Sequence, residues 1–144
     1  MRFLLLMFLF VFSANAFATN NEEFIGWIKT QTPTNLAKFL SENTAKQLPI
    51  QIDSITVFMG VFSVGDTITM RIQIQKTKKD FIALLNENGK TLKSYIPEFN
   101  AMVHNMGCSQ EVNKAQIEQG IKYKYIVSDL EFKKLFETYV KSCD

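Results

Sequence analysis

Residues 55–76 read ITVFMGVFSVGDTITMRIQIQK and carry the clearest structural signal in the chain. Apolar and polar side chains alternate through two runs that meet at Gly65-Asp66, and such alternation is typical of strands with one buried face. A Gly-Asp pair suits the two-residue turns that join antiparallel strands. The stretch therefore predicts a β-hairpin that turns at Gly65-Asp66.

The turn also predicts the register of the hairpin, because the residues that flank a two-residue turn lie opposite each other and set every later pair. On this register Val61 lies opposite Met70 and Met59 lies opposite Ile72, so the apolar side chains meet on one face. We expect that face to be buried, and it includes Met59, Val61, Met70 and Ile72. The opposite face is half polar, with three of its residues, Thr69, Arg71 and Gln73, expected to be accessible.

This half-polar face of the hairpin is the candidate binding surface. Phe58, Phe62 and Arg71 lie together on it in the predicted register. Aromatic side chains and arginine are enriched at the energetic centres of protein interfaces. A helix could instead cover the two phenylalanines, which would then belong to a second layer of core.

The first eighteen residues predict a cleavable secretory signal. Arg2 provides a positive start, residues 3–12 are all apolar, and alanines follow at alternate positions up to Ala18. The apolar run is shorter than the roughly 20 residues of a spanning helix. We expect cleavage after Ala18, a periplasmic or secreted location, and no stable membrane anchor once the segment is removed.

The composition sets the class of molecule. The predicted mature chain, residues 19–144, is long enough for a single domain with a buried core and too short for two. It loses only Arg2 from the charged residues, so a net charge of +2 for the full chain falls by one. Charge this close to neutral gives no reason to expect nucleic acid as a partner.

Two cysteines remain in the mature chain, Cys108 and Cys143. An even number of cysteines in an exported protein favours a disulfide, and we expect this pair to be joined. The alternative makes Cys108 a nucleophile activated by His104, four residues earlier on an expected helix. That chemistry needs a thiolate, which a disulfide removes.

Apolar residues at helical spacing predict helices before the hairpin. The first begins at Asn20 or Asn21 and is interrupted at Thr32-Pro33. Thr32 can cap a second helix that has Pro33 at its first position, which is where proline is tolerated. This second helix is expected to end before Pro49.

Further helices are predicted after the hairpin. Asp80 is the expected cap of a helix that weakens at Asn88-Gly89. Pro97 is expected to start a short helix, with Gly107 as its left-handed C-terminal cap. Residues 111–119 predict one more short helix.

The C-terminal part of the chain begins with an alternating run, residues 121–127, that predicts a strand. The following tail allows two structures. Ser128-x-x-Glu131 is a capping box, and later apolar residues fall at helical spacing. However, Phe136, Thr138 and Val140 also alternate, and a strand here would complete a second hairpin, which we favour.

A set of scattered residues supports this reading of the fold. The set is Leu48-Pro49-x-x-x-Asp53-x-x-Thr56, Gly65-x-x-Ile68, Cys108, Gly120-x-x-Tyr123-x-Tyr125 and Cys143. The pattern resembles a loose family of small exported bacterial proteins of uncharacterised function. The resemblance implies a helix, a hairpin, one or two helices and a second hairpin, with the two cysteines bridged. It brings no activity and no site residues.

The predicted fold class is therefore α+β. N-terminal helices precede a β-hairpin, more helices follow, and a second hairpin or a C-terminal helix ends the chain. The strands are expected to form a small antiparallel sheet packed on the helices.

The sequence offers no recognisable catalytic or metal site. His104 is the single histidine, and no Cys/His spacing would hold zinc. Phosphate-binding glycine loops and serine nucleophile motifs are missing. Asp53, Asp66 and Asp80 stand at element boundaries, where turn formation and capping explain them. We expect no cofactor, no metal and no catalysis.

Recognition of another protein is the function that remains. We expect an exported, non-enzymatic protein-binding module, such as an immunity-type inhibitor or an accessory protein of a secretion or envelope assembly. The alternative is a small secreted enzyme or effector whose active site has no recognisable spacing. A deep pocket with converging polar groups would favour the enzyme, and a shallow amphipathic sheet face would favour binding.

Overall fold

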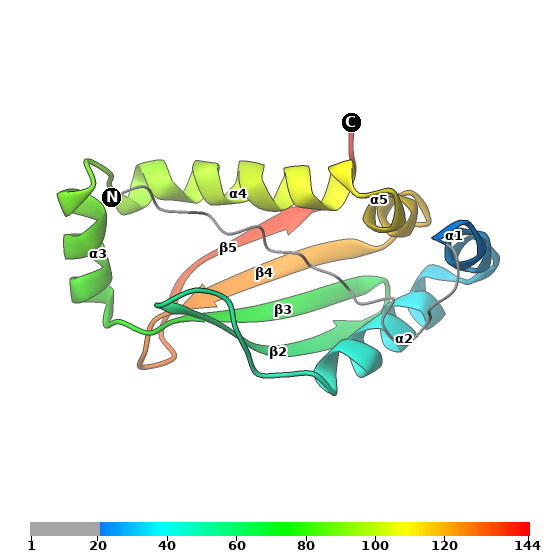
Figure 1. The fold of residues 1–144 in the computed structure, drawn as a ribbon, viewed down its shortest axis with the longest axis horizontal. Helices are drawn as coiled ribbons and strands as arrows, with labels where there is room; N and C mark the ends of the chain where they lie inside the picture. The colour runs from blue at the N-terminus through cyan, green and yellow to red at the C-terminus, as the bar shows by residue number, and fades with distance from the viewer. Residues whose placement is uncertain (1–20) are drawn as a thin grey trace.

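A computed structural model describes residues 21–144 (Figure 1). The predicted signal segment lies outside the described residues. The helices are α1 (Asn21–Thr30), α2 (Pro33–Ala45), α3 (Lys78–Glu87), α4 (Leu92–Ser109) and α5 (Glu111–Glu118). The strands are β1 (Ile50–Gln51), β2 (Thr56–Val64), β3 (Thr67–Ile74), β4 (Lys122–Ser128) and β5 (Lys134–Val140). The predicted α+β fold class, with a small sheet packed on helices, is confirmed.

The strands form one sheet in the order β1-β2-β3-β4-β5. Its pairs are antiparallel except for β3 and β4, which are parallel, so the sheet is mixed and the expectation of a purely antiparallel sheet is wrong. The reason is the connection: the chain leaves β3, passes through α3, α4 and α5, and returns beside β3 in the same direction. Parallel neighbours require such a crossover.

The second hairpin, β4 with β5, is present, and the helical alternative for the C-terminal tail is wrong. Alternation outweighs the capping box because Phe136, Thr138 and Val140 all enter the core from β5. The ring of Phe136 lies 5.3 Å from the ring of Phe99 on α4. A helix over these residues could not place all three side chains against the sheet's inner face.

The first hairpin turns at Gly65-Asp66 as predicted, with a φ angle of 58° at Gly65. Val61 lies opposite Met70, also as predicted. Beyond Gly60 the register changes, because Met59 forms a β-bulge and Phe58 lies opposite Ile72 in its place. The predicted pairing of Met59 with Ile72 is therefore wrong.

The bulge exchanges the faces of two side chains. Phe58 enters the core and is only 3% exposed, whereas Met59 is exposed. An extra residue in one strand reverses which side each later residue faces.

On β3, Met70 and Ile72 are buried and Arg71 is exposed, as predicted. Thr69 and Gln73 are buried, contrary to prediction. Thr69 stands on an inner strand between Phe62 and Lys124 of the neighbouring strands. The Gln73 Nε2 atom donates to the carbonyl of Leu130, 3.3 Å away, so its burial is compensated by a hydrogen bond.

The helix caps follow the sequence in part. Thr32 caps α2 by accepting a hydrogen bond from the Asn35 N–H, as predicted. The cap of α3 is Thr77 and not Asp80, because the Thr77 hydroxyl takes the Asp80 N–H at 3.2 Å. Asp80 thus stands in the first turn, where its negative charge is favourable.

Helix α4 begins at Leu92, with Thr91 as its cap, and runs through Pro97 and Gly107. The predictions that Pro97 starts a helix and that Gly107 ends one are wrong. A capping box between Thr91 and Ser94 starts the helix earlier, and the missing N–H of one proline removes a single hydrogen bond. A Cβ atom at position 107 would lie 3.1 Å from Ile117, so Gly107 allows α4 to pack closely against α5.

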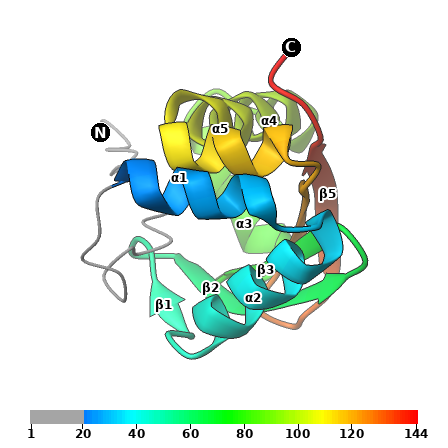
Figure 2. The same ribbon diagram turned by 90° about the vertical axis from the view of Figure 1, so that its right-hand side faces the viewer.

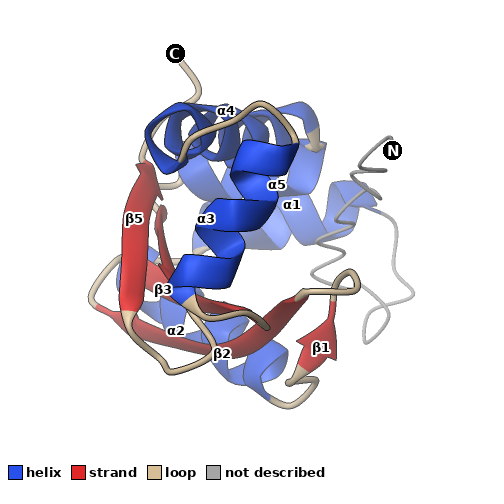
Figure 3. Ribbon diagram, turned by 90° about the vertical axis from the view of Figure 1, so that its left-hand side faces the viewer, coloured by secondary structure: helices blue, strands red, loops and turns tan. Residues whose placement is uncertain are grey.

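The helices contact one face of the sheet. The Phe99 ring of α4 lies 6.2 Å from Tyr125 on β4, and Tyr125 is the neighbour of Met70 on β3. Ser41 of α2 donates to Ser63, which projects from β2 on the same face. Figure 3 shows the curved sheet with α3, α4 and α5 on its concave side, and Figure 2 shows α1 beside α5 at the end of the molecule where α2 lies.

Candidate protein-binding surface

The convex face of the sheet carries two rows of side chains that cross four strands. Strand register places Phe62, Thr69, Lys124 and Tyr139 in one row. The other row contains Gly60, Arg71, Ile126 and Glu137. We call these eight residues the open face. All of them point away from the core residues Met70 and Tyr125, because side chains alternate along a strand.

Arg71 is the centre of the second row. Its exposed side chain lies over Gly60, and a Cβ atom at position 60 would lie 3.7 Å from the Arg71 Cδ atom. The glycine therefore lets the aliphatic part of the arginine rest on β2. Among residues 21–144, Arg71 has no ion pair. Its guanidinium group is available for a carboxylate from another molecule.

Tyr139 is exposed on β5, at the end of the first row, and two lysines make cation–π contacts with its ring. The Lys124 Nζ atom lies 5.4 Å from the centre of its ring, and Lys141 Nζ lies 4.9 Å from it. Its hydroxyl donates to Glu137, 3.2 Å away. Cation–π contacts on an exposed ring are individually weak but restrict its orientation.

Two of the lysines near Tyr139 share one carboxylate, that of Glu137. Lys124 Nζ lies 3.5 Å from a Glu137 carboxylate oxygen, and Lys134 Nζ lies 3.2 Å from the same atom. Hydrogen bonding to Lys134, reinforced by the charge of Lys124, holds the pKa of Glu137 below its usual value. Hydrogen bonding to Tyr139 and then the charge of Glu137 raise the pKa of Lys124. Of the two cations in the open face, Lys124 is paired with Glu137, and Arg71 has no ion pair within residues 21–144.

Of the three predicted contact residues, the structure brings two together. Phe62 is 45% exposed and belongs with Arg71 to the open face. Phe58 is buried because of the bulge at Met59, so its placement on this surface is wrong. The sequence did not point to Lys124 and Tyr139, because their position beside the hairpin depends on the parallel β3–β4 pairing. The binding role of Phe62 and Arg71 stays a prediction.

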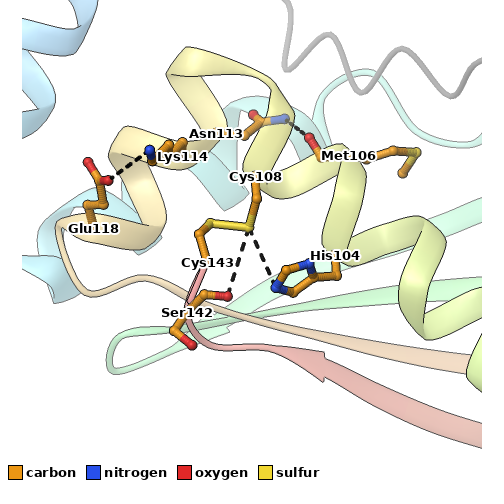
Figure 4. Close-up of a disulfide and its surroundings, with 8 residues drawn as sticks. All are labelled: His104, Met106, Cys108, Asn113, Lys114, Glu118, Ser142 and Cys143. Carbon is orange, nitrogen blue, oxygen red and sulfur yellow. Dashed lines mark hydrogen bonds and ion pairs between the residues drawn. A yellow bond between two sulfur atoms is a disulfide. The ribbon is translucent and has the colours of Figure 1, made fainter.

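The disulfide joins the end of α4 to the C-terminal segment of the chain (Figure 4). Cys108, near the end of α4, is joined to Cys143, with a sulfur–sulfur distance of 2.07 Å. His104 Nε2 is 3.9 Å from the Cys108 Sγ atom. Because the sulfur is bonded to Cys143, it offers no thiolate for the nucleophile hypothesis. The bridge instead tethers the chain after β5 to α4.

A small pocket lies next to Met70, Met106 and Tyr125, with a volume of about 10 Å³. This is room for about one water molecule and not for a substrate. Within residues 21–144, no group of three or more His, Cys, Asp or Glu side chains is placed to hold a metal ion. In the same range, no helix is long and apolar enough to cross a bilayer.

Comparison with known proteins gives a fold likeness. No family model and no curated protein matches the chain. The pilotin EpsS of the Vibrio vulnificus type 2 secretion system aligns with a TM-score of 0.62 at 13% identity, covering 81% of this chain and 96% of the pilotin. A Pseudomonas aeruginosa protein proposed to be secreted aligns with a TM-score of 0.62 at 10% identity, with the same coverage of 81% and 96%.

The type II secretion system pilotin AspS of Vibrio cholerae aligns with a TM-score of 0.52 at 11% identity, covering 80% of this chain and 93% of that protein. At identities this low, the three structural alignments show a shared fold and no more than that. The chain is thus a small α+β domain with helices packed on one face of its sheet, and it is similar in fold to two secretion pilotins.

Proposed function

We propose that this chain is an exported, non-enzymatic accessory protein of a bacterial secretion or envelope assembly, and that it acts by binding a protein partner. The predicted signal segment supports export. The disulfide between Cys108 and Cys143 fits an oxidising compartment. The fold likeness to two secretion pilotins supports an accessory role, and it favours this function over an immunity-type inhibitor.

The open face is the observation that carries the proposal. Its exposed aromatic rings, Phe62 and Tyr139, stand at the two ends of one row, and the unpaired Arg71 stands in the next. Aromatic and arginine side chains of this kind supply much of the energy of protein interfaces. A convex sheet face fits an extended protein surface better than a small substrate, which needs a concave pocket.

The partner is expected to place a carboxylate over Arg71 and an apolar group beside Phe62. A bidentate contact between guanidinium and carboxylate is among the stronger hydrogen-bonded pairs. The aliphatic stem of Arg71 passes over Gly60, which leaves the guanidinium group free to meet that carboxylate.

The test is capture of an envelope protein by the purified chain, followed by measurement with that protein in purified form. Phe62→Ala and Arg71→Ala are made separately. Each is expected to weaken binding at least about tenfold without lowering the melting temperature. Matched controls are Phe132→Ala, an exposed phenylalanine away from the open face, and Lys38→Ala, an exposed cation on α2.

The controls should bind as the unmodified chain does. Binding unaffected by both open-face substitutions would remove this surface as the contact site. Capture of a toxin in place of a secretion or envelope component would instead identify an immunity-type inhibitor.

A further inference from the structure

The turn between β4 and β5 presents two large apolar side chains to solvent. Leu130 is 45% exposed and Phe132 is 68% exposed. Phe132 has a φ angle of 61°, in the left-handed region that bulky side chains rarely adopt. Backbone strain of this kind persists where surrounding contacts impose it, and it is concentrated at functional sites.

Asp129 imposes this conformation. It is fully buried, and its Oδ1 atom accepts hydrogen bonds from the N–H groups of Glu131 and Lys133, each 2.9 Å away. Its Oδ2 atom accepts from the N–H of Lys78, 3.3 Å away. The carboxylate therefore ties the turn to the start of α3, and Leu130 and Phe132 are held outward on a rigid support.

Five lysines lie on the turn itself and on the chain segment beside it. The Leu130 N–H donates to the carbonyl of Lys76, 2.9 Å away, so the connection from β3 to α3 runs beside the turn. Both segments lie together at one end of the molecule, on the left in Figure 1. Their lysines are Lys76, Lys78, Lys79, Lys133 and Lys134. We call these five lysines with Leu130 and Phe132 the basic tip.

The basic tip has an excess of one positive charge, because its five lysines lie with four acidic residues, Asp80, Asp129, Glu131 and Glu137. Glu131 pairs with Lys133 at 2.8 Å, and Lys134 pairs with Glu137 at 3.2 Å. Lys76, Lys78 and Lys79 have no ion pair within residues 21–144. Unpaired lysines next to exposed apolar side chains match the chemistry of an anionic lipid surface, which attracts cations and accepts apolar groups.

We propose that the basic tip docks the protein on a bilayer that contains anionic phospholipids. Leu130 and Phe132 enter the boundary between headgroups and acyl chains, and the lysines pair with the lipid phosphates. Two side chains on a convex turn offer far too little area for a stable protein interface, whereas a bilayer needs no complementary pocket. The open face lies across the strands and the tip lies beyond their ends, so the two surfaces can be occupied together.

The test is flotation of the exported protein, purified after removal of its signal segment, with lipid vesicles. Vesicles of phosphatidylglycerol and phosphatidylethanolamine are expected to carry the protein, and vesicles of phosphatidylcholine alone are not. Binding should fall when NaCl rises from about 0.1 M to about 0.5 M, because salt screens the lysines. Lys78→Gln combined with Lys79→Gln should weaken it in the same way.

The substitutions Leu130→Ser and Phe132→Ser together should reduce anionic vesicle binding at least about tenfold. The matched control is Met59→Ser with Val64→Ser, which removes two exposed apolar side chains away from the tip and should leave vesicle binding unchanged. Phe132→Asn separates docking from folding: asparagine tolerates a positive φ, so the melting temperature should stay equal or rise while binding falls.

Flotation of the Leu130→Ser, Phe132→Ser variant equal to that of the unmodified chain would overturn the proposal. Failure of the unmodified chain to float with anionic vesicles would do the same. A protein captured through Leu130 and Phe132 in the absence of vesicle binding would assign the tip to a protein partner instead. The vesicles contain no protein, so this result is independent of the proposed function of the open face.

Discussion

Arg71 and Gly60 face each other across β3 and β2, and the arginine side chain lies over the glycine. This pair marks the point where the register of the hairpin changes. Between Gly60 and the turn, every residue of β2 lies opposite the residue of β3 that the predicted register gives it. On the far side, the bulge at Met59 moves Phe58 into the core. The same local event thus decides which aromatic residue can take part in binding.

The bulge predicts opposite roles for two phenylalanines of β2. Phe58→Ala should lower the free energy of unfolding by about 3 to 5 kcal/mol, because it leaves a cavity in the core. Phe62→Ala should change it by less than about 1 kcal/mol, because this ring is half exposed. Urea denaturation followed by circular dichroism measures both values. A larger loss for Phe62 would show that the two faces of β2 are assigned the wrong way round.

The disulfide is expected to contribute a large share of the stability. Cys108→Ser with Cys143→Ser should lower the free energy of unfolding by about 2 to 4 kcal/mol, because the bridge closes a long loop and restricts the unfolded chain. Urea denaturation of both proteins without reductant gives the difference. Two titratable thiols in the denatured, unreduced natural protein would show that the bridge does not form.

Asp129 should be the most sensitive residue of the β4–β5 turn. Asp129→Ala removes the acceptor of three backbone N–H groups and should cost about 3 kcal/mol of unfolding free energy. Asp129→Asn retains one carbonyl oxygen and should cost less. The comparison is Asp53→Ala, an exposed aspartate that accepts one backbone N–H. Faster hydrogen exchange at Glu131 in Asp129→Ala would locate the effect, and equal losses in Asp53→Ala and Asp129→Ala would refute it.

The parallel pairing of β3 and β4 can be tested through Asp66. Lys122 Nζ lies 2.7 Å from Asp66 Oδ2, and this hydrogen bond, helped by one from Thr67, holds the pKa of Asp66 below its usual value. Lys122→Gln should raise that pKa toward the ordinary value for aspartate. Carbon chemical shifts of the Asp66 carboxyl group across an acid titration measure the change.

The sign of the pH dependence follows from the lowered pKa of Asp66. The ion pair stabilises the fold above about pH 4, where the unfolded chain is also ionised, and this contribution is lost as pH falls through the lower pKa of the folded state. The stability difference between the natural chain and Lys122→Gln should therefore shrink in acid. An unchanged pKa of Asp66 in the variant would contradict the pairing.

Local chemistry was readable from the sequence. The turn at Gly65 needs a residue that adopts a positive φ, and the alternating side chains on either side need one buried face. The Thr32 cap, the weak point at Asn88-Gly89 and the strand over residues 121–127 rest on equally short-range rules. The fold class follows from these elements, since each must bury its apolar side against another.

The remaining features were decided only by the tertiary structure, because they depend on contacts between segments that are distant in the sequence. Alternation alone cannot show that β4 lies parallel to β3, and so it cannot place Tyr139 in the same row as Phe62. The bulge at Met59 and the burial of Asp129 are likewise invisible in the pattern. The sequence determines which residues prefer to be buried, but the packing of helices against one sheet face determines which side chains remain exposed for binding, because burial is a property of the whole assembly of elements.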